Sequence, residues 1–460
     1  MAALDAISAT GADVGSDAGL TRQTLAEIFY LSAGVTKRRS YPGGEMVFRA
    51  AACTGALYHI DLYLVCGGLE DIEAGVYHFS PQDFSLRRLR RGDYRGALVT
   101  ATGAQPSTVN APAILICAST FWRNAWKYQS RAYRHCYWDS GTILANLFAA
   151  AAAWRLPAKV VLGFVDAAVS ELLSLDNQRE APLSLIALGY TATQGARPFP
   201  AIEPLALETE PLSKREVDYP AMREMHQASS LASAEEVIDW RREKKGGGKT
   251  DEGRNELQSI VLQPFNDEEM PQDKIEEVII RRGSTREFAR EAISYAQLST
   301  LLDRAARGIA VDFLNPEDSL NDLYLIVNAV DGLPPGAYVY RRDTRALELL
   351  KEGDFRREAG YLGLGQAIPA DCSVNVYFLA DLHRVFDRFG NRGYRAAQLE
   401  ASIMGGKLYL AAYAQRLGAS GLTFFDDDVT EFFSPHAAGK SVMFLIALGK
   451  SAKRTALSAM

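Results

Sequence analysis

Apolar residues recur along the chain with two different periods, which predict helices and strands. Helical spacing, with apolar residues three and four apart, covers four stretches: residues 20–33, 139–154, 293–306 and 398–416. The first and third begin behind Thr21 and Ser294, residue types that cap helix N-termini. Runs of β-branched and large apolar residues predict strands at 62–65, 113–117, 323–326 and 441–446. Because helices and strands do not alternate strictly, the pattern predicts an α+β fold.

The same order of elements occurs twice, because the sequence repeats itself. Three pairs of motifs are 261 positions apart (392 minus 131, for example): 75–77 with 336–338, 92–95 with 353–356, and 131–134 with 392–395. Two later pairs are 260 apart: 162–169 with 422–429, and 186–189 with 446–449. A repeat of this length indicates two tandem copies of one fold. We expect a first domain over 1–205, a polar linker over 206–268 and a second domain over 269–460.

Composition narrows the class of protein. The chain has 460 residues, of which 48% are hydrophobic and 23% charged, with a net charge of −6; this is ordinary globular usage. The acidic balance and the lack of a long basic run argue against nucleic acid as a partner. The longest apolar run, 143–154, is too short to cross a bilayer and no signal peptide is recognisable, so we expect no membrane contact and a cytoplasmic location.

Cysteine and histidine spacing gives no support for a metal site. The five cysteines are an odd number and contain no CxxC pair, which fits a reducing compartment. The six histidines lack the spacing of metal ligands. We therefore expect no metal.

Four stretches, taken in order, resemble the nitroreductase-like flavoprotein family, specifically its SagB-type branch of peptide dehydrogenases and azoline oxidases: residues 49–58, 127–134, 281–288 and 418–426. The resemblance implies FMN at the interface of two such units, usually two chains. One unit holds the phosphate and a loop of the other covers the ring. In a tandem chain, the two domains would form an intramolecular pseudo-dimer.

The third stretch contains a candidate phosphate clamp, made of Arg281, Arg282, Ser284 and Arg286. Guanidinium groups and a hydroxyl just ahead of a helix suit a dianionic phosphate. Three arginines at such a position also oppose the usual preference for acidic residues there, and a bound anion would explain them. The alternative is a solvated charge cluster at a helix start.

The resemblance implies further cofactor-binding residues in both domains. A ring-covering loop comprises Cys53, Thr54, Gly55, Ala56 and Leu57, and small residues that let the backbone approach the flavin are Ala419, Ser420, Gly421 and Leu422. Lys450 and Arg454 follow the last strand and could reach the phosphate. The alternatives are an ordinary helix cap and turn for the small residues and a charged tail for the basic ones.

Comparison of the two copies predicts how many flavins bind. Residues 8–15 of the first copy stand opposite the arginine motif and contain no clamp, whereas residues 314–319 of the second copy replace the ring loop with a rigid, acidic segment. The two defects are complementary, so one FMN per chain is expected.

A candidate catalytic pair is found only in the first copy. Azoline oxidases of the family carry a Lys-Tyr pair, which this chain has as Lys127 and Tyr128, while the second copy has Arg388 and Phe389. A lysine removes a carbon-bound proton only if its pKa is lowered towards neutrality, and arginine stays protonated. The alternative is a surface lysine beside a half-buried tyrosine.

These features predict an FMN-dependent oxidoreductase that dehydrogenates a peptide-derived or small-molecule substrate by hydride transfer to the flavin, with biosynthetic partner proteins. The alternatives are an NAD(P)H-dependent reductase of nitro compounds or quinones and a flavin-free scaffold protein. His59, where proline is usual, and Thr142, where histidine is common, depart from the family pattern. We expect them to bear on substrate choice more than on flavin binding.

Overall fold

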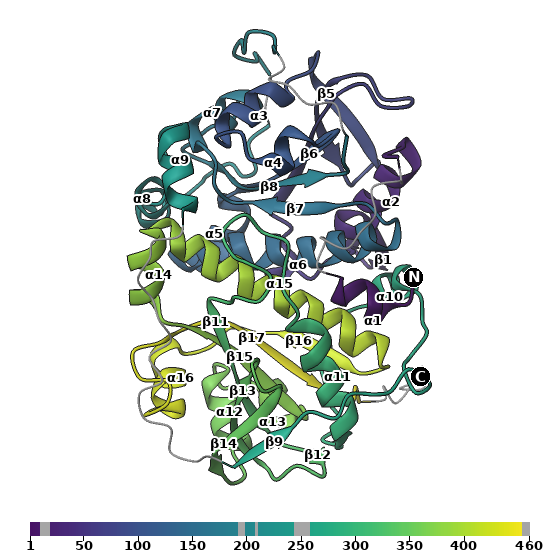
Figure 1. Ribbon diagram of the computed structural model, residues 1–460, viewed down its shortest axis with the longest axis vertical. Helices are drawn as coiled ribbons and strands as arrows, with labels where there is room; N and C mark the ends of the chain where they lie inside the picture. Colours follow the sequence, from purple (N-terminus) through teal and green to yellow (C-terminus); the bar gives the residue numbers. More distant parts are fainter. Residues whose placement is uncertain (10–18, 192–197, 208–209, 243–257, 453–460) are drawn as a thin grey trace.

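Two antiparallel sheets lie on either side of a central pair of long helices (Figure 1). The computed structural model describes residues 1–9, 19–191, 198–207, 210–242 and 258–452. The first sheet has the order β5-β4-β3-β6-β8-β7, with β3 Ile60–Cys66, β4 Gly75–Ser80, β5 Ser85–Arg91, β6 Ala113–Thr120, β7 Ala158–Val161 and β8 Glu180–Leu188. The second has the order β16-β17-β15-β11-β13-β14-β9, with β9 Ser259–Val261, β11 Asn321–Val327, β13 Gly336–Arg341, β14 Ala346–Glu352, β15 Val374–Ala380, β16 Gly418–Gly421 and β17 Ser441–Gly449.

The helices surround these sheets and fill the space between them. In the first domain and the linker they are α1 Ala3–Ser8, α2 Arg22–Ala33, α3 Arg95–Ala101, α4 Pro106–Val109, α5 Trp122–Tyr128, α6 Ala132–Ala153, α7 Asp166–Leu173, α8 Pro220–Ala228 and α9 Ala234–Arg241. In the second domain they are α10 Ile275–Arg281, α11 Tyr295–Ala305, α12 Arg356–Leu362, α13 Ala367–Asp371, α14 Leu382–Phe389, α15 Arg392–Ala414 and α16 Asp426–Phe433. Two small ribbons complete the fold: β1 Val35–Tyr41 with β2 Gly44–Arg49, and β10 Ile293–Ser294 with β12 Val330–Asp331.

The predicted α+β tandem fold is confirmed, and most predicted elements are present. Thr21 and Ser294 cap α2 and α11, each in a reciprocal capping box. The predicted starts of the two long helices were wrong, because α6 begins at Ala132 and α15 at Arg392. Most residues in the first turns of both helices are buried at the domain junction whatever their polarity, so apolar periodicity alone did not include these turns.

One element at the start of the first domain and one in the linker pair with the second domain. Ala3 N–H of α1 donates to Asp273 O at 2.9 Å. β9, inside the stretch expected to be linker, pairs with β14 and extends the second sheet. The chain therefore ties the two domains together at more points than a single connection would. No described helix combines the length and the apolar character needed to cross a membrane.

Small residues let the two central helices cross closely. A Cβ on Gly141 would meet Ser402 Oγ at 1.9 Å, and one on Gly406 would meet the Ala145 Cβ at 2.5 Å. Both pairs join positions that the sequence repeat makes equivalent (402 minus 141, and 406 minus 145, are each 261). The helices thus cross on a pseudo-twofold axis.

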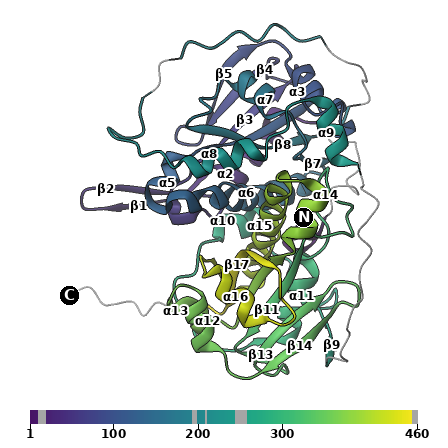
Figure 2. The same ribbon diagram turned by 90° about the vertical axis from the view of Figure 1, so that its left-hand side faces the viewer.

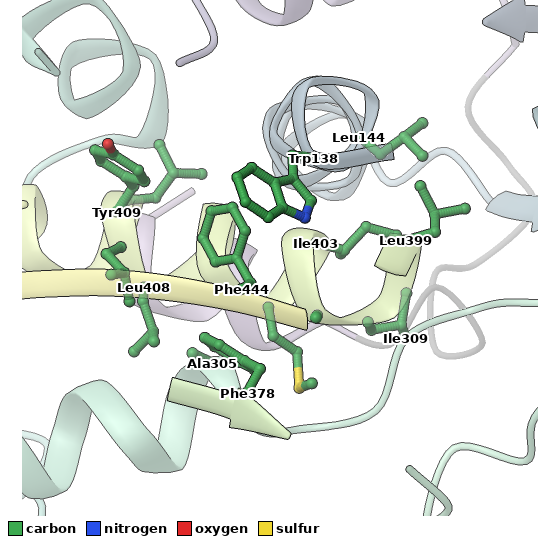
Figure 3. Packing of buried hydrophobic residues seen from close by; sticks show 14 of the residues in the cluster. Trp138, Leu144, Ala305, Ile309, Phe378, Leu399, Ile403, Leu408, Tyr409 and Phe444 are labelled. Atoms are coloured by element: carbon green, nitrogen blue, oxygen red, sulfur yellow. The ribbon is translucent and has the colours of Figure 1, made fainter. Parts of the chain in front are cut away.

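The two domains share one hydrophobic core. Figure 3 shows Trp138 of α6 packed against Phe444 of β17, beside Leu399 and Ile403 of α15. The rings of Trp138 and Phe444 meet edge to face, with centroids 5.4 Å apart. Trp138 Nε1 also donates to Gln398 Oε1 at 2.7 Å. Because a side chain of the first domain fills the core of the second, the domain junction is a permanent part of the fold.

Candidate functional site

The repeated Arg-x-Tyr-Arg motifs join the domains through reciprocal ion pairs. Arg131 and Arg134, at the start of α6, both bind Asp426 of the second domain, and the Arg131 contact is 2.8 Å. Arg392 and Arg395, at the start of α15, bind Asp166 of the first domain, each at 2.6 Å. The motifs therefore act as structural clamps.

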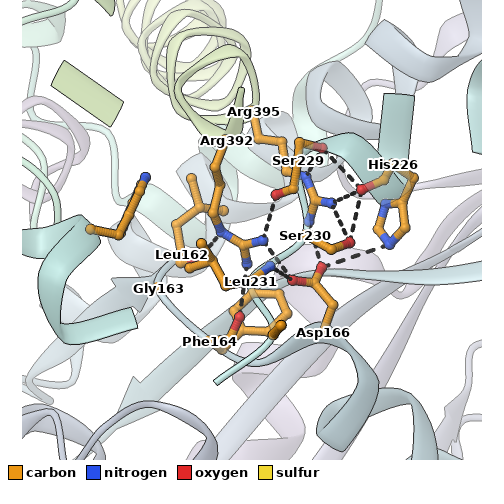
Figure 4. A network of polar contacts seen from close by, with 12 residues as sticks. Leu162, Gly163, Phe164, Asp166, His226, Ser229, Ser230, Leu231, Arg392 and Arg395 are labelled. Atoms are coloured by element: carbon orange, nitrogen blue, oxygen red, sulfur yellow. Dashed lines mark hydrogen bonds and ion pairs between the residues drawn. The ribbon is translucent and has the colours of Figure 1, made fainter. Parts of the chain in front are cut away.

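The linker covers the clamp formed by Arg392, Arg395 and Asp166 (Figure 4). Arg395 Nε donates to Ser229 Oγ at 2.8 Å, and Leu231 N–H donates to Asp166 Oδ2 at 3.1 Å. The side chains of Arg392 and Arg395 are 1% and 0% exposed, compared with 30% and 25% for Arg131 and Arg134. Burial alone would raise the pKa of Asp166, but the charges of Arg392 and Arg395 lower it to about 2. The two sides of the junction are therefore unequal.

On the covered side, backbone pairing closes the junction. Val160 N–H of β7 donates to Ala310 O at 2.9 Å, and Asp312 N–H donates to Val160 O at 3.0 Å. The Asp312 carboxylate accepts hydrogen bonds from Leu162 N–H at 2.7 Å and from Arg241 Nε of α9 at 3.0 Å. A segment of the second domain thus lies directly along the edge of the first sheet.

The equivalent place on the other side is not closed in this way. By the repeat, Ser420 of β16 corresponds to Val160, and Ala50 corresponds to Val311. In the described part of the chain, no backbone hydrogen bond joins β16 to residues 49–52. Ser420 Oγ is buried and has no hydrogen-bond partner among the described residues. The second domain instead reaches this segment through Arg282, whose Nε and Nη2 donate to Ala50 O at 3.0 and 2.7 Å.

The predicted ring loop lies at this open side and is held by Asp139 of α6. Thr54 donates to Asp139 Oδ1 through its backbone N–H and its hydroxyl, both at 2.8 Å, and Cys53 Sγ lies 3.0 Å from Oδ2. Ala56 and Tyr58 adopt positive φ angles of 55° and 48°, an uncommon conformation that costs free energy and is often found at functional sites. The carboxylate therefore fixes a strained loop in one conformation.

His59 pairs with the same carboxylate beneath the loop. Its Nε2 lies 3.0 Å from Asp139 Oδ2 and its Nδ1 lies 2.8 Å from Ser119 Oγ. Burial alone would lower the pKa of His59, but hydrogen bonds and charges from Asp139 and Cys136 raise it to about 9. The pKa of Asp139 is lowered by the same pairing against the effect of burial. A cavity of only about 10 Å³ adjoins the loop, room for about one water molecule.

This ion pair predicts a loss of stability at high pH. A raised folded-state pKa gives a stabilisation that is complete below the unfolded pKa of about 6.5 and disappears as pH rises through about 9. We expect wild type to lose up to about 3 kcal/mol more than His59→Gln between about pH 6 and 10, measured by denaturant unfolding. The two proteins must be compared because Lys407 also titrates in this range. Burial lowers its pKa to about 7, so its effect is to raise the free energy of unfolding as pH rises. Parallel pH profiles for the two proteins would show that the pair is not charged.

Of the predicted catalytic pair, Tyr128 lies against the ring loop and Lys127 lies beside Tyr128. A Cβ on Gly55 would meet the hydroxyl oxygen of Tyr128 at 2.8 Å, so this tyrosine packs on the loop. Lys127 is exposed, and its Nζ lies 5.2 Å from the centre of the Tyr128 ring. Arg123, one helical turn before Lys127, donates to Tyr58 O at 3.2 Å. The end of α5 and the ring loop therefore form one continuous surface.

The arginines of the predicted phosphate clamp have different surroundings. Arg281 donates hydrogen bonds to the carboxylate of Asp273, at 2.6 Å, and to the carbonyl of Tyr413. Arg282 is buried, and no described carboxylate forms an ion pair with it. Arg286 is exposed and likewise has no ion pair with a described residue. Two of the three cations therefore have no counter-charge within the part of the chain that the structure describes.

The remaining predicted residues lie around the same turn of the second domain. Ser284 Oγ lies 3.4 Å from Tyr409 OH, which also accepts from Gly421 N–H. Ala419 O accepts from Thr285 N–H at 2.8 Å. Leu422 N–H donates to Leu445 O at 3.1 Å, inside the sheet. Lys450 pairs with Glu291 at 3.4 Å, and Arg454 lies outside the described residues.

Sequence reasoning did not identify Asp139 or Tyr409 as site residues. Asp139 holds the ring loop, and Tyr409 connects Ser284 to Gly421 and lies beneath the Arg282 guanidinium, 5.7 Å from ring centre to Cζ. The one available signal was a carboxylate within a helix otherwise predicted to be buried on most faces, because a buried charge needs a partner. Tyr409 had no such signal.

Comparison with known proteins agrees with this architecture. The family model described as the Nitroreductase family matches residues 20–190 and 279–450, once in each domain. The chain belongs to the nitroreductase family. It resembles a protein named as a nitroreductase, MJ1384 of Methanocaldococcus jannaschii, with 27% identity over 170 residues, which cover 37% of this chain and 81% of that protein. Its family relatives also include the Escherichia coli microcin B17-processing protein McbC, 28% identical over 152 residues, or 32% of this chain and 52% of McbC.

A solved structure shows the same two-domain nitroreductase arrangement over most of the chain. A crystal structure of a nitroreductase-family protein from Anabaena variabilis superposes with a TM-score of 0.78 and 25% sequence identity, covering 94% of this chain and 88% of that one. Tandem nitroreductase domains are therefore found in another protein of similar length, and the family places this chain among oxidoreductases.

Proposed function

We propose that this chain is an FMN-dependent oxidoreductase holding one FMN at the open side of the domain junction. The observation that carries the proposal is the difference between the two sides. β7 is paired with residues 310–312, whereas β16 makes no backbone hydrogen bond to residues 49–52 within the described chain. Backbone pairing therefore closes one side of the junction, and the other side is the one at which we propose that a ligand lies between the domains.

The residues at the open side fit a phosphorylated flavin. The buried Arg282 lacks a carboxylate partner among the described residues, although buried charges are normally paired. The unpartnered Ser420 hydroxyl is a buried polar group of the kind that a ligand satisfies. Arg282, Ser284 and Arg286 would hold the phosphate, and the loop from Cys53 to Leu57 would cover the ring. When bound, FMN supplies hydride-transfer chemistry.

The chain's own residues orient the substrate and move a proton. Asp139 fixes the ring loop, and Tyr128 packs on that loop from α5. We propose that Lys127 removes a carbon-bound proton from the substrate, because its flexible side chain lies at the edge of the surface formed by the ring loop and the end of α5. Likeness to McbC, named as a microcin-processing protein, supports a peptide-derived substrate and biosynthetic partner proteins.

One observation favours a second candidate, an NAD(P)H-dependent reductase of nitro compounds or quinones. Lys127 is exposed at the end of α5, whereas a base that removes a carbon-bound proton normally lies in a site shielded from water. A reductase needs no such base. Anaerobic mixing of the FMN-loaded protein with NADPH distinguishes the two, because rapid bleaching of the flavin absorbance is expected of the reductase alone.

We predict one FMN per chain. Titration of flavin-free protein with FMN, followed by flavin fluorescence, should reach saturation at one equivalent of FMN per chain. The measured affinity should not depend on protein concentration, because a site shared between two chains would make it do so. Ser420→Val places at the open side the residue found at the closed side and should weaken binding, because it fills space and removes a hydroxyl. The matched control Val160→Ser should leave FMN affinity unchanged. Saturation at two equivalents would refute the proposal.

A further inference from the structure

The β1–β2 hairpin carries one side chain that reaches the other domain. Figure 2 shows the hairpin projecting from the side of the molecule, and most of its residues are exposed. Lys37 is half-buried, like the other residues at the base of the hairpin, and its Nζ donates to Arg282 O at 2.7 Å and Arg281 O at 3.2 Å. A two-stranded hairpin has little stability of its own, so this contact helps to fix its position.

The ammonium group lies beside the candidate phosphate clamp. Its Nζ is 3.9 Å from the position a Cβ would take on Gly283, the residue just before Ser284. The neighbouring charges are those of Arg282 and Arg39, and no described carboxylate forms an ion pair with Lys37. Two cations, Lys37 and Arg282, thus lie close together without a counter-charge from the described residues, an arrangement that is unfavourable unless an anion binds.

We propose that Lys37 is a phosphate-binding residue supplied by the first domain, so that the FMN phosphate is held from both domains. This inference rests on the proposed function and adds a residue that the repeat and the arginine motif did not indicate. The hairpin then contributes to cofactor binding through Lys37, while its neighbour Arg38 points to Glu45 on the opposite strand, at 2.8 Å. Binding of the phosphate would also fix the hairpin against the second domain.

A purely structural role for Lys37 predicts a different result. Arg281 O lies at the end of α10, and a cation there stabilises the helix C-terminus. Loss of such a cap would disturb the site as a whole and weaken FMN and riboflavin equally. Loss of a phosphate ligand would weaken FMN alone, because riboflavin has no phosphate.

The test measures dissociation constants of the full chain for FMN and for riboflavin by fluorescence quenching. Lys37→Met should weaken FMN roughly 10- to 100-fold, as expected for a charge-assisted contact, and change riboflavin less than about threefold. Lys37→Gln keeps a donor for the two carbonyls without the charge and should behave like Lys37→Met. Lys37→Arg should retain most of the FMN affinity, and the hairpin control Arg38→Met should match wild type.

The results that would overturn the inference can be told apart. Equal losses for FMN and riboflavin would assign Lys37 to the helix cap, and unchanged FMN affinity in both charge-free variants would remove it from the site. Should Lys37→Met fail to fold, Lys37→Gln decides the matter through the same FMN-to-riboflavin ratio. Wild-type protein that binds neither ligand would refute the proposed function itself and this inference with it.

Discussion

Replacing Asp166 with alanine is expected to lower the free energy of unfolding by about 3–5 kcal/mol, the cost of breaking a buried ion pair. The variant leaves Arg392 and Arg395 without a counter-charge, and both are almost fully buried. It also removes the acceptor of Leu231 N–H, which holds the linker at the junction. Denaturant unfolding of both proteins, at the same FMN concentration, measures the difference.

The sequence repeat provides a matched control for this experiment. Asp426 is equivalent to Asp166 but is 30% exposed, and its arginine partners are 30% and 25% exposed, so Asp426→Ala should cost only about 1 kcal/mol. The pKa of Asp166 is lowered to about 2, so its contribution to stability is complete above the unfolded pKa of about 4 and is lost as pH falls towards 2. Equal losses in the two variants would show that linker coverage has no energetic effect.

The fold could be predicted largely because the chain repeats itself. A constant offset near 261 identifies two copies of one domain, and it also identifies which positions become equivalent across the junction. The reciprocal clamps were not predicted, because the partner of each Arg-x-Tyr-Arg motif lies in the other domain, almost 300 positions away for Arg131 and Asp426. Periodicity reports on burial within an element and carries no information on such distant pairs.

The site could be predicted in part. The ring loop, the Lys-Tyr pair and the arginine motif were expected near one flavin, and the structure places them on one side of the junction: Tyr128 contacts Gly55, and Arg282 contacts Ala50. The roles within the motif were not predictable. Arg281 and Arg282 are adjacent in the sequence, yet Arg281 forms an ion pair with a carboxylate and Arg282 forms none with a described residue. That difference depends on the direction of each side chain at the end of α10.

Missing motifs predicted that the second copy does not form a flavin site of its own, and the structure adds a closed side of the junction that the motifs did not predict. The acidic segment 314–319 of the second copy was expected to be a poor ring loop. The preceding residues 310–312 in fact pair with β7, and the linker adds Arg241 to the same place. A linker thought to be only a connection therefore closes one side of the junction, which is why the asymmetry extends beyond the motifs themselves.

Lys127→Ala is expected to reduce turnover of the true substrate by about 10²–10⁴-fold, the usual effect of losing a general base. FMN binding and the flavin spectrum should stay nearly unchanged, because Asp139, not Lys127, holds the ring loop. Lys127→Arg should be almost as damaging, since a guanidinium does not release its proton near neutral pH. Steady-state and single-turnover rates, with FMN content measured in each variant, give the comparison.

Arg388, the equivalent of Lys127, supplies the control. Its Cζ lies 4.6 Å from the Phe389 ring centre, on the covered side of the junction, so Arg388→Ala should leave turnover unchanged. Full activity in Lys127→Arg would contradict the base role and leave the reductase as the better account of the same flavin site.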